Sequence, residues 1–206
     1  MNDLTHTISE TMLLYPGIPQ PRIHDFATPT VDGYGMSEFC FWNHLGTHLD
    51  APTHFYAEGW TLDQFPVDRF VVTVRTVDCQ TIANITTEHL ARQLAHLTPG
   101  EGVLLLTGQY RRWGTPQYFD PFAVLTEDGA NWLLKKKVGM ILVDAPSIDA
   151  VDTVDFPNHR RLLRDPLLVV ENLAYQEGLP GTFRVAALPI KVKNSNGCPA
   201  RVITLD

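Results

Sequence analysis

The pattern of apolar and polar residues along the chain predicts strands that alternate with helices. Residues 69–78 contain a β-branched run, which is typical of a strand. Thr86 and Thr126 can each cap a helix, the first ending before Pro99 and the second closed by the lysines at 135–137. The fold class is therefore α/β, with helices packed against a mixed sheet. Further strands are predicted at the apolar stretches 102–107, 138–144, 167–171, 183–192 and 201–205.

Composition and charge limit the classes of protein to which the chain can belong. Residues 1–206 are predicted to form one domain, because no shift in composition divides them. The net charge of −7 argues against nucleic acid or an anionic membrane as the main partner. No signal peptide is evident, and no stretch is long enough to span a bilayer. The three cysteines form no CxxC pair and predict a cytoplasmic protein, in which Cys40 is a small packed side chain.

The eleven residues 44–54, with the sequence HLGTHLDAPTH, concentrate metal-binding side chains. Neutral imidazole and ionised carboxylate are common ligands of Zn²⁺ and similar ions. His48 and Asp50 are two positions apart and therefore share one face of an extended strand. The glycine between His44 and His48 permits a bend toward the same point, and a proline places His54 on the loop beyond the strand.

Each of these residues alone has a simpler interpretation. A single histidine is most often a hydrogen-bonded or surface residue, and Asp50 could simply start a turn. The joint spacing instead favours a metal site. It is not the helical HExxH pair, because no glutamate follows the first histidine and the glycine and proline oppose a helix.

The segment resembles the HxGTHxDxPxH signature of the cyclase family, which includes bacterial kynurenine formamidase and isatin hydrolase. All seven fixed positions of the signature are matched. The resemblance implies the swivelling β/β/α fold of that family, in a single domain. It continues in LTHTI at 4–8, YPG at 15–17, DAPSID at 144–149, HRRLL at 159–163, ENL at 171–173 and NGCPAR at 196–201, where the family has DGSPxR.

The resemblance also implies a pair of zinc ions and their ligands. In the formamidase branch two zinc ions lie side by side, so two Zn²⁺ per chain are expected, with Mn²⁺ as the alternative for a site rich in carboxylates. Glu171 would contact both ions, and His54 would be a proton shuttle and not a ligand. Shared carboxylates suit this chemistry, because they offset the repulsion between two close cations. The implied ligands are His44, His48 and Asp50 for the first ion, and Asp50, His159 and Glu171 for the second.

Two of the implied ligands have alternative interpretations. Glu171 could be a solvated carboxylate, but it follows the apolar run 167–170 and so stands at the end of a buried strand, where an acid needs a partner. His159 could lie in the first turn of a short exposed helix opened by Asn158, and the residues alone leave this open.

An aromatic segment, residues 109–119, follows a predicted strand and carries four aromatic residues and two arginines. It is either a wall over the metal site or an amphipathic surface loop. The resemblance places Tyr15 where formamidases usually have a substrate-contacting Trp, so Tyr15 is the candidate substrate contact. Relatives of the family are typically dimers or larger, which implies a homodimer or homotetramer in which the aromatic segment helps to wall the neighbour's site.

The function predicted from these features is a metal-dependent hydrolase that cleaves an amide-type acyl bond, since a bound divalent ion lowers the pKa of water to near neutrality. The resemblance implies arylformamidase activity on a small aromatic amide, N-formylkynurenine. The departures at Tyr15 and at residues 196–199 keep an isatin-type cyclic amide or lactone hydrolase open. A non-catalytic metal-binding protein is the alternative of another class. His54 argues against it, because a pure binding site needs no general acid.

Overall fold

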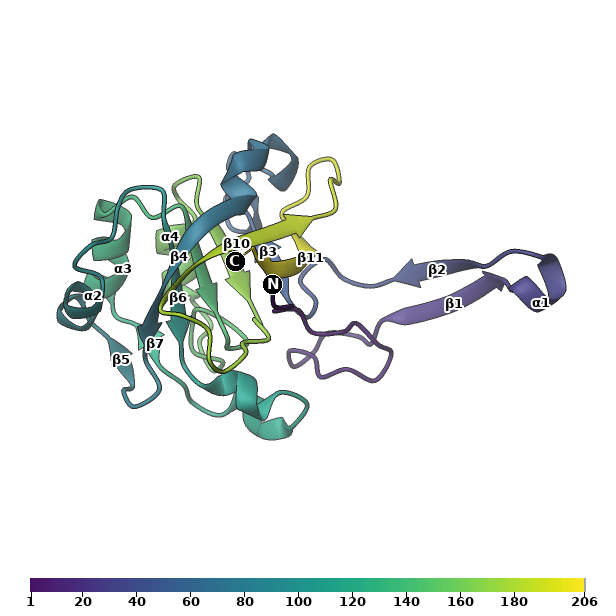
Figure 1. The fold of residues 1–206 in the computed structure, drawn as a ribbon, viewed down its shortest axis with the longest axis horizontal. Coiled ribbons are helices and arrows are strands. Elements are labelled where there is room, and N and C mark those ends of the chain that lie inside the picture. The colour runs from purple at the N-terminus through teal and green to yellow at the C-terminus, as the bar shows by residue number, and fades with distance from the viewer. Residues whose placement is uncertain (206) are drawn as a thin grey trace.

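A closed barrel of seven strands forms the centre of the computed structural model, which describes residues 1–205 (Figure 1). The order around the barrel is β10, β11, β3, β9, β8, β6 and β4, and β10 closes it by pairing with β4. The strands are β3 (His48–Asp50), β4 (Val71–Asp78), β6 (Gly102–Leu106), β8 (Met140–Val143), β9 (Leu168–Glu171), β10 (Thr182–Pro189) and β11 (Gly197–Thr204).

The barrel is a mixed sheet, which confirms the α/β prediction. Strands β4, β6, β8 and β9 pair in parallel, whereas β3, β10 and β11 pair only in antiparallel fashion. The parallel strands coincide with the short apolar stretches of the sequence, as expected for strands buried on both faces. The two closing strands were misplaced, because β10 ends at Pro189 and β11 begins at Gly197, earlier than residues 192 and 201.

Two hydrophobic cores lie on the two faces of the parallel strands. Leu104 of β6 packs inside the barrel, and its neighbours Val103 and Leu105 pack on the outer face. In β8, Leu142 likewise packs inside the barrel and Ile141 packs on the outer face. This period of two is that of an extended strand, and it places residues 103–106 and 140–143 alternately in the two cores.

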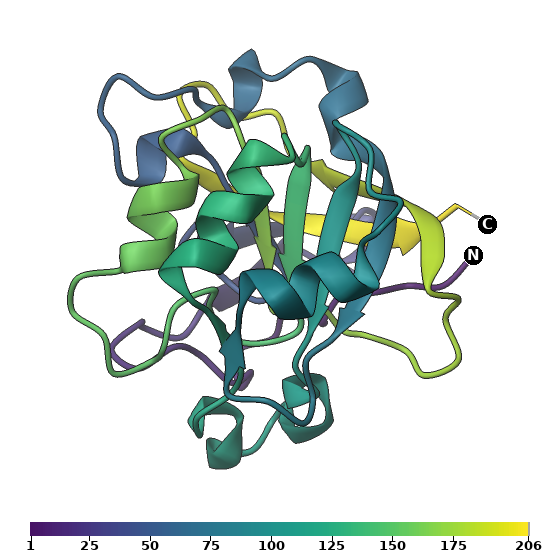
Figure 2. The same ribbon diagram turned by 90° about the vertical axis from the view of Figure 1, so that its left-hand side faces the viewer.

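Three helices cover the outer core: α2 (Thr87–Gln93), α3 (Glu127–Lys135) and α4 (Pro157–Leu162). Figure 2 shows them side by side in front of the strands. Thr86 and Thr126 cap α2 and α3 as predicted, since their hydroxyls accept hydrogen bonds from the third backbone N–H of each helix. Helix α2 ends at Gln93, earlier than expected, because the chain turns before Pro99.

Three further features were not predicted from the sequence. Strands β1 (Arg22–Ala27) and β2 (Met36–Cys40), joined by α1 (Pro29–Asp32), form a hairpin that extends away from the barrel (Figure 1). The short strands β5 (Asn84–Ile85) and β7 (Val124–Leu125) pair in parallel. Cys40 is exposed on the hairpin, so its prediction as a packed side chain was wrong. Among residues 1–205 no helix is long and apolar enough to cross a membrane.

Candidate metal centre

The register of β3 between β9 and β11 gathers the predicted site on the outer face of the barrel. Leu49, the middle residue of β3, packs inside the barrel, so His48 and Asp50 on either side of it point outward. His48 lies opposite Glu171 of β9, and Asp50 lies opposite Gly197 of β11. Side chains from distant parts of the sequence therefore meet on one face.

The ring of His48 is held in one tautomer by its own backbone. Its Nδ1 lies 2.8 Å from the carbonyl oxygen of Gly46, which can only accept a hydrogen bond, so Nδ1 is the donor. The positive φ of Gly46 (56°) provides the bend that the sequence predicted at this position. The Nε2 atom of His48 then faces Asp50 Oδ1 at 3.3 Å and Glu171 Oε2 at 3.7 Å.

His159 reaches the same carboxylates from helix α4. Its Nδ1 lies 2.7 Å from Asp149 Oδ2, and its Nε2 lies 3.4 Å from Asp50 Oδ2 and 3.2 Å from Glu171 Oε1. The residue is buried, so the interpretation as an exposed helix turn does not hold. Asn158 does not open the helix either. It lies inside α4, where its side chain donates to the carbonyl oxygens of Leu125 and Ile148.

The arrangement requires a positive species between the rings and the carboxylates. With both Nδ1 atoms acting as donors, neutral rings of His48 and His159 would aim lone pairs at carboxylate oxygens. Burial lowers the pKa of each ring, but the nearby carboxylates outweigh it and raise the pKa of His48 to about 9 and that of His159 well above its usual value. A divalent ion would supply the positive charge at this place, because imidazole and carboxylate groups release protons when they bind a metal.

Asp50 shows that the residues fit a metal ion. Its Oδ2 atom is buried and has no hydrogen-bond partner among the described residues. Two groups of side chains offer ligand atoms within 4.8 Å of one another, and Asp50 belongs to both: one group adds His44 and His48, and the other adds His54 and His159. A buried carboxylate that belongs to both groups and has an oxygen without a hydrogen-bond partner is suited to bind a metal ion.

His44 is positioned by the C-terminal segment of the chain. Its Nδ1 lies 2.6 Å from Asp50 Oδ1, and its Nε2 lies 3.0 Å from Asn196 Oδ1. Asn43 donates to the same Asn196 oxygen. A Cβ atom on Gly197 would lie 2.3 Å from Cε1 of His44, so only glycine leaves room for the ring here.

His54 lies beside the cluster in the turn at Pro52–His54, beyond the end of β3 as predicted. Its ring stacks on that of His44, with centroids 3.9 Å apart, and meets His159 edge-on at 5.9 Å. Burial lowers its pKa to about 4. The ring is therefore neutral at pH 7, and the geometry is compatible with either a ligand or a proton acceptor.

A cavity of about 430 Å³ opens above the cluster. The aromatic segment forms part of its wall, since Trp113, Tyr118 and Phe119 all line the cavity. Its arginines are exposed, and Arg111 lies over the ring of Tyr110, so the segment is a surface loop as well. Trp113 stacks on His6 with ring centroids 3.7 Å apart. The segment packs against its own chain and encloses that chain's cavity. The other apolar or aromatic lining residues are Leu13, Leu14, Tyr15, Ile18, Phe55, Pro146 and Phe156.

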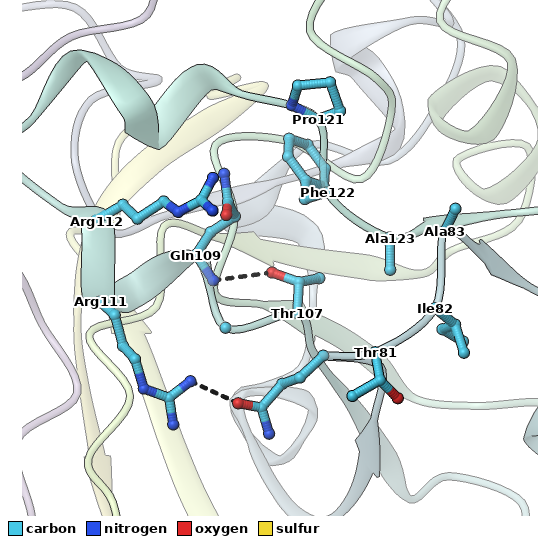
Figure 3. Close-up of a pocket in the computed structure, with 12 residues that line it drawn as sticks. Thr81, Ile82, Ala83, Thr107, Gln109, Arg111, Arg112, Pro121, Phe122 and Ala123 are labelled. Atoms are coloured by element: carbon cyan, nitrogen blue, oxygen red, sulfur yellow. Dashed lines mark hydrogen bonds between the residues drawn. The ribbon is translucent and has the colours of Figure 1, made fainter.

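A second hollow, of about 560 Å³, lies between residues 80–83 and the start of the aromatic segment (Figure 3). Two arginines reach its wall, but both have acidic partners. Arg111 binds Glu177 at 2.9 Å and the side chain of Gln80, and Arg112 lies 3.5 Å from an oxygen of Asp120. Among the described residues that line this hollow there is no group of metal-binding side chains, whereas two such groups lie at the first cavity.

Sequence reasoning missed three residues that support the cluster. Asp149, Asn196 and Gly197 lie in segments that resemble the family, but the sequence alone assigns them no role. Asp149 holds the ring of His159, Asn196 hydrogen-bonds that of His44, and Gly197 leaves room for the His44 ring. The signal available in the sequence was that each lies in a short segment that resembles the cyclase family, although these segments are far from residues 44–54.

Comparison with known proteins decides the family. The sequence model described as Putative cyclase matches residues 2–150, more than half of the chain. The chain belongs to the cyclase family. A curated relative, kynurenine formamidase of Salinibacter ruber, is 28% identical over 207 residues, covering 99% of this chain and 96% of that protein. Kynurenine formamidase of Bacillus thuringiensis is 29% identical over 160 residues, covering 78% of this chain and 75% of that protein.

Solved structures of other members share the fold. Isatin hydrolase A of Labrenzia aggregata has a TM-score of 0.88 at 23% identity, covering 98% of this chain and 92% of its own. A predicted metal-dependent hydrolase of Bacillus stearothermophilus has a TM-score of 0.82 at 26% identity, covering 98% of this chain and 96% of its own. Together with the His and Asp cluster, these relationships make this cyclase-family chain a metal-dependent hydrolase.

Proposed function

We propose that this hydrolase removes formate from an N-formyl aromatic amine such as N-formylkynurenine, as an arylformamidase. One observation carries the proposal: three histidines and two carboxylates meet at the base of a cavity walled by aromatic rings, with His54 beside them. The relatives named kynurenine formamidase support it. An aromatic amide fits such a wall because flat rings pack favourably on one another.

The proposed cofactor is a pair of Zn²⁺ ions, with Mn²⁺ as the alternative. When bound, a divalent ion supplies Lewis acidity that activates water and polarises a carbonyl group. Asp50 and Glu171 each offer two oxygens, which suits them to be shared between two ions. The residues that would hold the ions are His44, His48 and Asp50 for the first, and Asp50, His159 and Glu171 for the second.

His54 is the proposed proton carrier. Its low pKa keeps the ring unprotonated at pH 7, so it can accept a proton from water as the amide carbon is attacked. It can then return the proton to the leaving amine nitrogen. Because His54 stacks on His44, the ring is held close to the reacting groups without adding a charge to the site.

Tyr15 lines the cavity, where its ring and not its hydroxyl is available to a substrate. The Tyr15 hydroxyl donates a hydrogen bond to the carbonyl oxygen of Val151 at 3.0 Å. Its ring meets Phe119 edge-on, with centroids 6.0 Å apart. We therefore assign Tyr15 a packing contact with the aromatic part of the substrate.

A cyclic amide of the isatin type is a second candidate, and a specific observation favours it. Among the described residues that line the cavity there is no lysine or arginine. The amino-acid carboxylate of N-formylkynurenine would then lack a basic side chain to bind it, whereas isatin carries no carboxylate. The fold shared with isatin hydrolase A supports this candidate as well.

A hydrolysis screen distinguishes these substrates. Protein reconstituted with Zn²⁺ or Mn²⁺ is assayed on N-formylkynurenine, isatin and a simple lactone, with His48→Ala prepared in parallel as a control for contaminating enzymes. We expect the highest kcat/KM on N-formylkynurenine. A preference for isatin would replace the first candidate by the second. Metal binding without turnover of any of the three would favour the non-catalytic alternative.

A further inference from the structure

Trp113 belongs to the wall between the cavity above the metal centre and another hollow, here called the outer hollow. The outer hollow has a volume of about 560 Å³. Its polar lining comes from Thr7, Ser9, Thr11 and Gln20 of the N-terminal segment. Trp113 lines both spaces, so its side chain separates them. Four residues of the N-terminal segment also line both: Leu13, Leu14, Tyr15 and Ile18.

The backbone around Trp113 is held by local turns. The backbone N–H of Trp113 donates to the carbonyl oxygen of Tyr110, and that of Thr115 donates to Arg112, so both hydrogen bonds stay within the aromatic segment. Arg112 and Gly114, on either side of Trp113, are exposed. The position of the indole ring therefore depends mainly on what the ring itself contacts.

Two other rings hold the indole of Trp113 in place. The imidazole of His6 stacks on it in parallel, with ring centroids 3.7 Å apart and an angle of 6° between the planes. The ring of Tyr118 meets it edge-on, with centroids 5.1 Å apart. Tyr118 is itself buried, and its hydroxyl donates to the side-chain oxygen of Asn172 at 2.9 Å. Stacked and edge-on contacts both favour a defined orientation, so the indole is fixed by its neighbours.

His6 is anchored to the segment that carries the metal-binding residues. Its backbone N–H donates to the hydroxyl oxygen of Thr47, in the segment 44–54, at 3.0 Å. The Thr47 hydroxyl in turn donates to the carbonyl oxygen of Asn172 at 2.7 Å. The Nε2 atom of His6 is buried and has no hydrogen-bond partner among the described residues, so stacking, and not a hydrogen bond at Nε2, orients the ring. His6 therefore places Trp113 at a fixed position relative to the metal centre.

We propose that Trp113, positioned by His6, limits the size of the aromatic group that the substrate can carry. With the indole in place, the cavity of about 430 Å³ suits one substituted benzene ring or a small bicyclic amide. A larger aromatic group would have to extend into the outer hollow, and the indole blocks that path. In its kinetic form this size limit rests on the proposed function, since a formamide must be cleaved, whereas a binding measurement tests it without turnover.

A series of substrates of increasing size tests the limit. Formanilide is compared with the three formanilides that carry a phenyl group at position 2, 3 or 4 of the ring. We expect wild type to disfavour at least one of the three by about tenfold or more in kcat/KM, because the added ring collides with the indole. Trp113→Ala should remove most of that difference, mainly through a lower KM. Trp132→Ala, at a half-buried position on helix α3, is the matched control and should keep the wild-type preference.

Replacement of His6 tests its positioning role. Without the stacked imidazole the indole is free to move, so His6→Ala should weaken the preference for formanilide in the same direction as Trp113→Ala. His6→Phe should restore the preference, since a phenyl ring can also stack. Quenching by acrylamide gives a second readout: the emission of Trp113, obtained by subtracting the spectrum of the matching Trp113→Phe protein, should be quenched more strongly in His6→Ala than in wild type. Circular dichroism and metal analysis verify that each variant is folded and loaded.

Binding of a bulky probe separates the size limit from the proposed function. N-phenyl-1-naphthylamine is uncharged, carries a phenyl and a naphthyl group, and fluoresces strongly in apolar surroundings. Metal-loaded Trp113→Ala should bind it at one site, from which formanilide displaces it, and wild type should bind it at least about tenfold more weakly. If no formanilide is cleaved by any form of the protein, the proposed function fails, and this measurement alone decides the size limit.

Three results would overturn the inference. The first is a wild type that cleaves all three phenyl-substituted formanilides as readily as formanilide. The second is a Trp113→Ala variant that keeps the wild-type preference, or that binds the probe no more tightly than wild type does. The third is a His6→Ala variant with the preference and the quenching of wild type, which would show that Trp113 is held without His6.

Discussion

One carboxylate oxygen of Asp149, Oδ2, accepts two hydrogen bonds from His159: one from its backbone N–H at 3.0 Å and one from its ring Nδ1 at 2.7 Å. The other oxygen of Asp149 accepts from the backbone N–H of Asn158 at 2.8 Å. Asp149 therefore fixes both the first turn of α4 and the direction in which Nε2 of His159 points. Such outer contacts also make an imidazole a stronger ligand.

Asp149→Asn should weaken metal binding without removing a ligand. An amide accepts more weakly and carries no charge, so we expect roughly a 10–100-fold loss of affinity for one of two ions. Metal titration followed by elemental analysis measures it. Asp155→Asn, an exposed neighbour, is the matched control, and equal affinities in the two variants would show that Asp149 does not position His159.

Metal analysis of the wild-type chain should give close to two divalent ions. In the proposed paired site, Asp50 and Glu171 would provide the shared oxygens on which the second ion depends. Glu171→Gln should therefore lower occupancy of one site more than the other and bring the content toward one ion. A wild-type content of one ion at saturating metal would reject the paired site.

His54→Ala should separate catalysis from metal binding. If His54 carries protons, the variant keeps its metal while turnover falls by about two to four orders of magnitude. His48→Ala should lose metal and activity together, because a catalytic site has few ligands to spare. His96→Ala, at an exposed position, controls for loss of a histidine. Loss of metal from His54→Ala would instead make His54 a ligand.

The pH dependence of stability should carry a contribution from His6. Burial lowers the pKa of His6 to about 4, from 6.5 when the chain is unfolded. Below pH 6.5 the unfolded chain therefore takes up a proton that the folded chain refuses. The free energy of unfolding should fall between pH 6.5 and 4, by about 3 kcal/mol at pH 4 from this residue.

His6→Phe isolates that contribution, because a phenyl ring can keep the stacking on Trp113 but cannot be protonated. Urea unfolding at pH 7 and at pH 4.5, with and without the substitution, measures the difference. We expect the stability of the variant to depend less on pH than that of wild type. Parallel pH profiles would mean that His6 is protonated in the folded chain.

The strands and the part of the site within residues 44–54 could be predicted from the sequence, because the patterns that indicate them lie within a few neighbouring residues. The β-branched run in β4 and the apolar stretches of β6, β8 and β9 have the composition of buried strands. The glycine at 46 and the spacing of His48 and Asp50 encode a bend and a shared strand face. These are properties of a few neighbouring residues.

The remaining features depend on contacts between distant segments. Burial of His159 follows from its contact with Asp149 and Glu171, which the residues around it do not reveal. The requirement for glycine at 197 follows only from the proximity of His44 in the folded chain. The hairpin of β1 and β2 was not predicted, because its apolar residues are exposed and follow no pattern of a buried face. Cys40 was wrongly expected to be packed because free cysteine is usually a buried side chain.

The place of β3 in the barrel has a consequence for how the enzyme is made. This strand comes early in the chain, yet both its neighbours, β9 and β11, come from the last forty residues. During translation the histidines at 44 and 48 emerge from the ribosome long before Glu171 and Gly197 do. The site therefore cannot assemble until the segments that carry Glu171 and Gly197 have been synthesised, and until then the early histidines lack the carboxylate and the glycine that complete their surroundings.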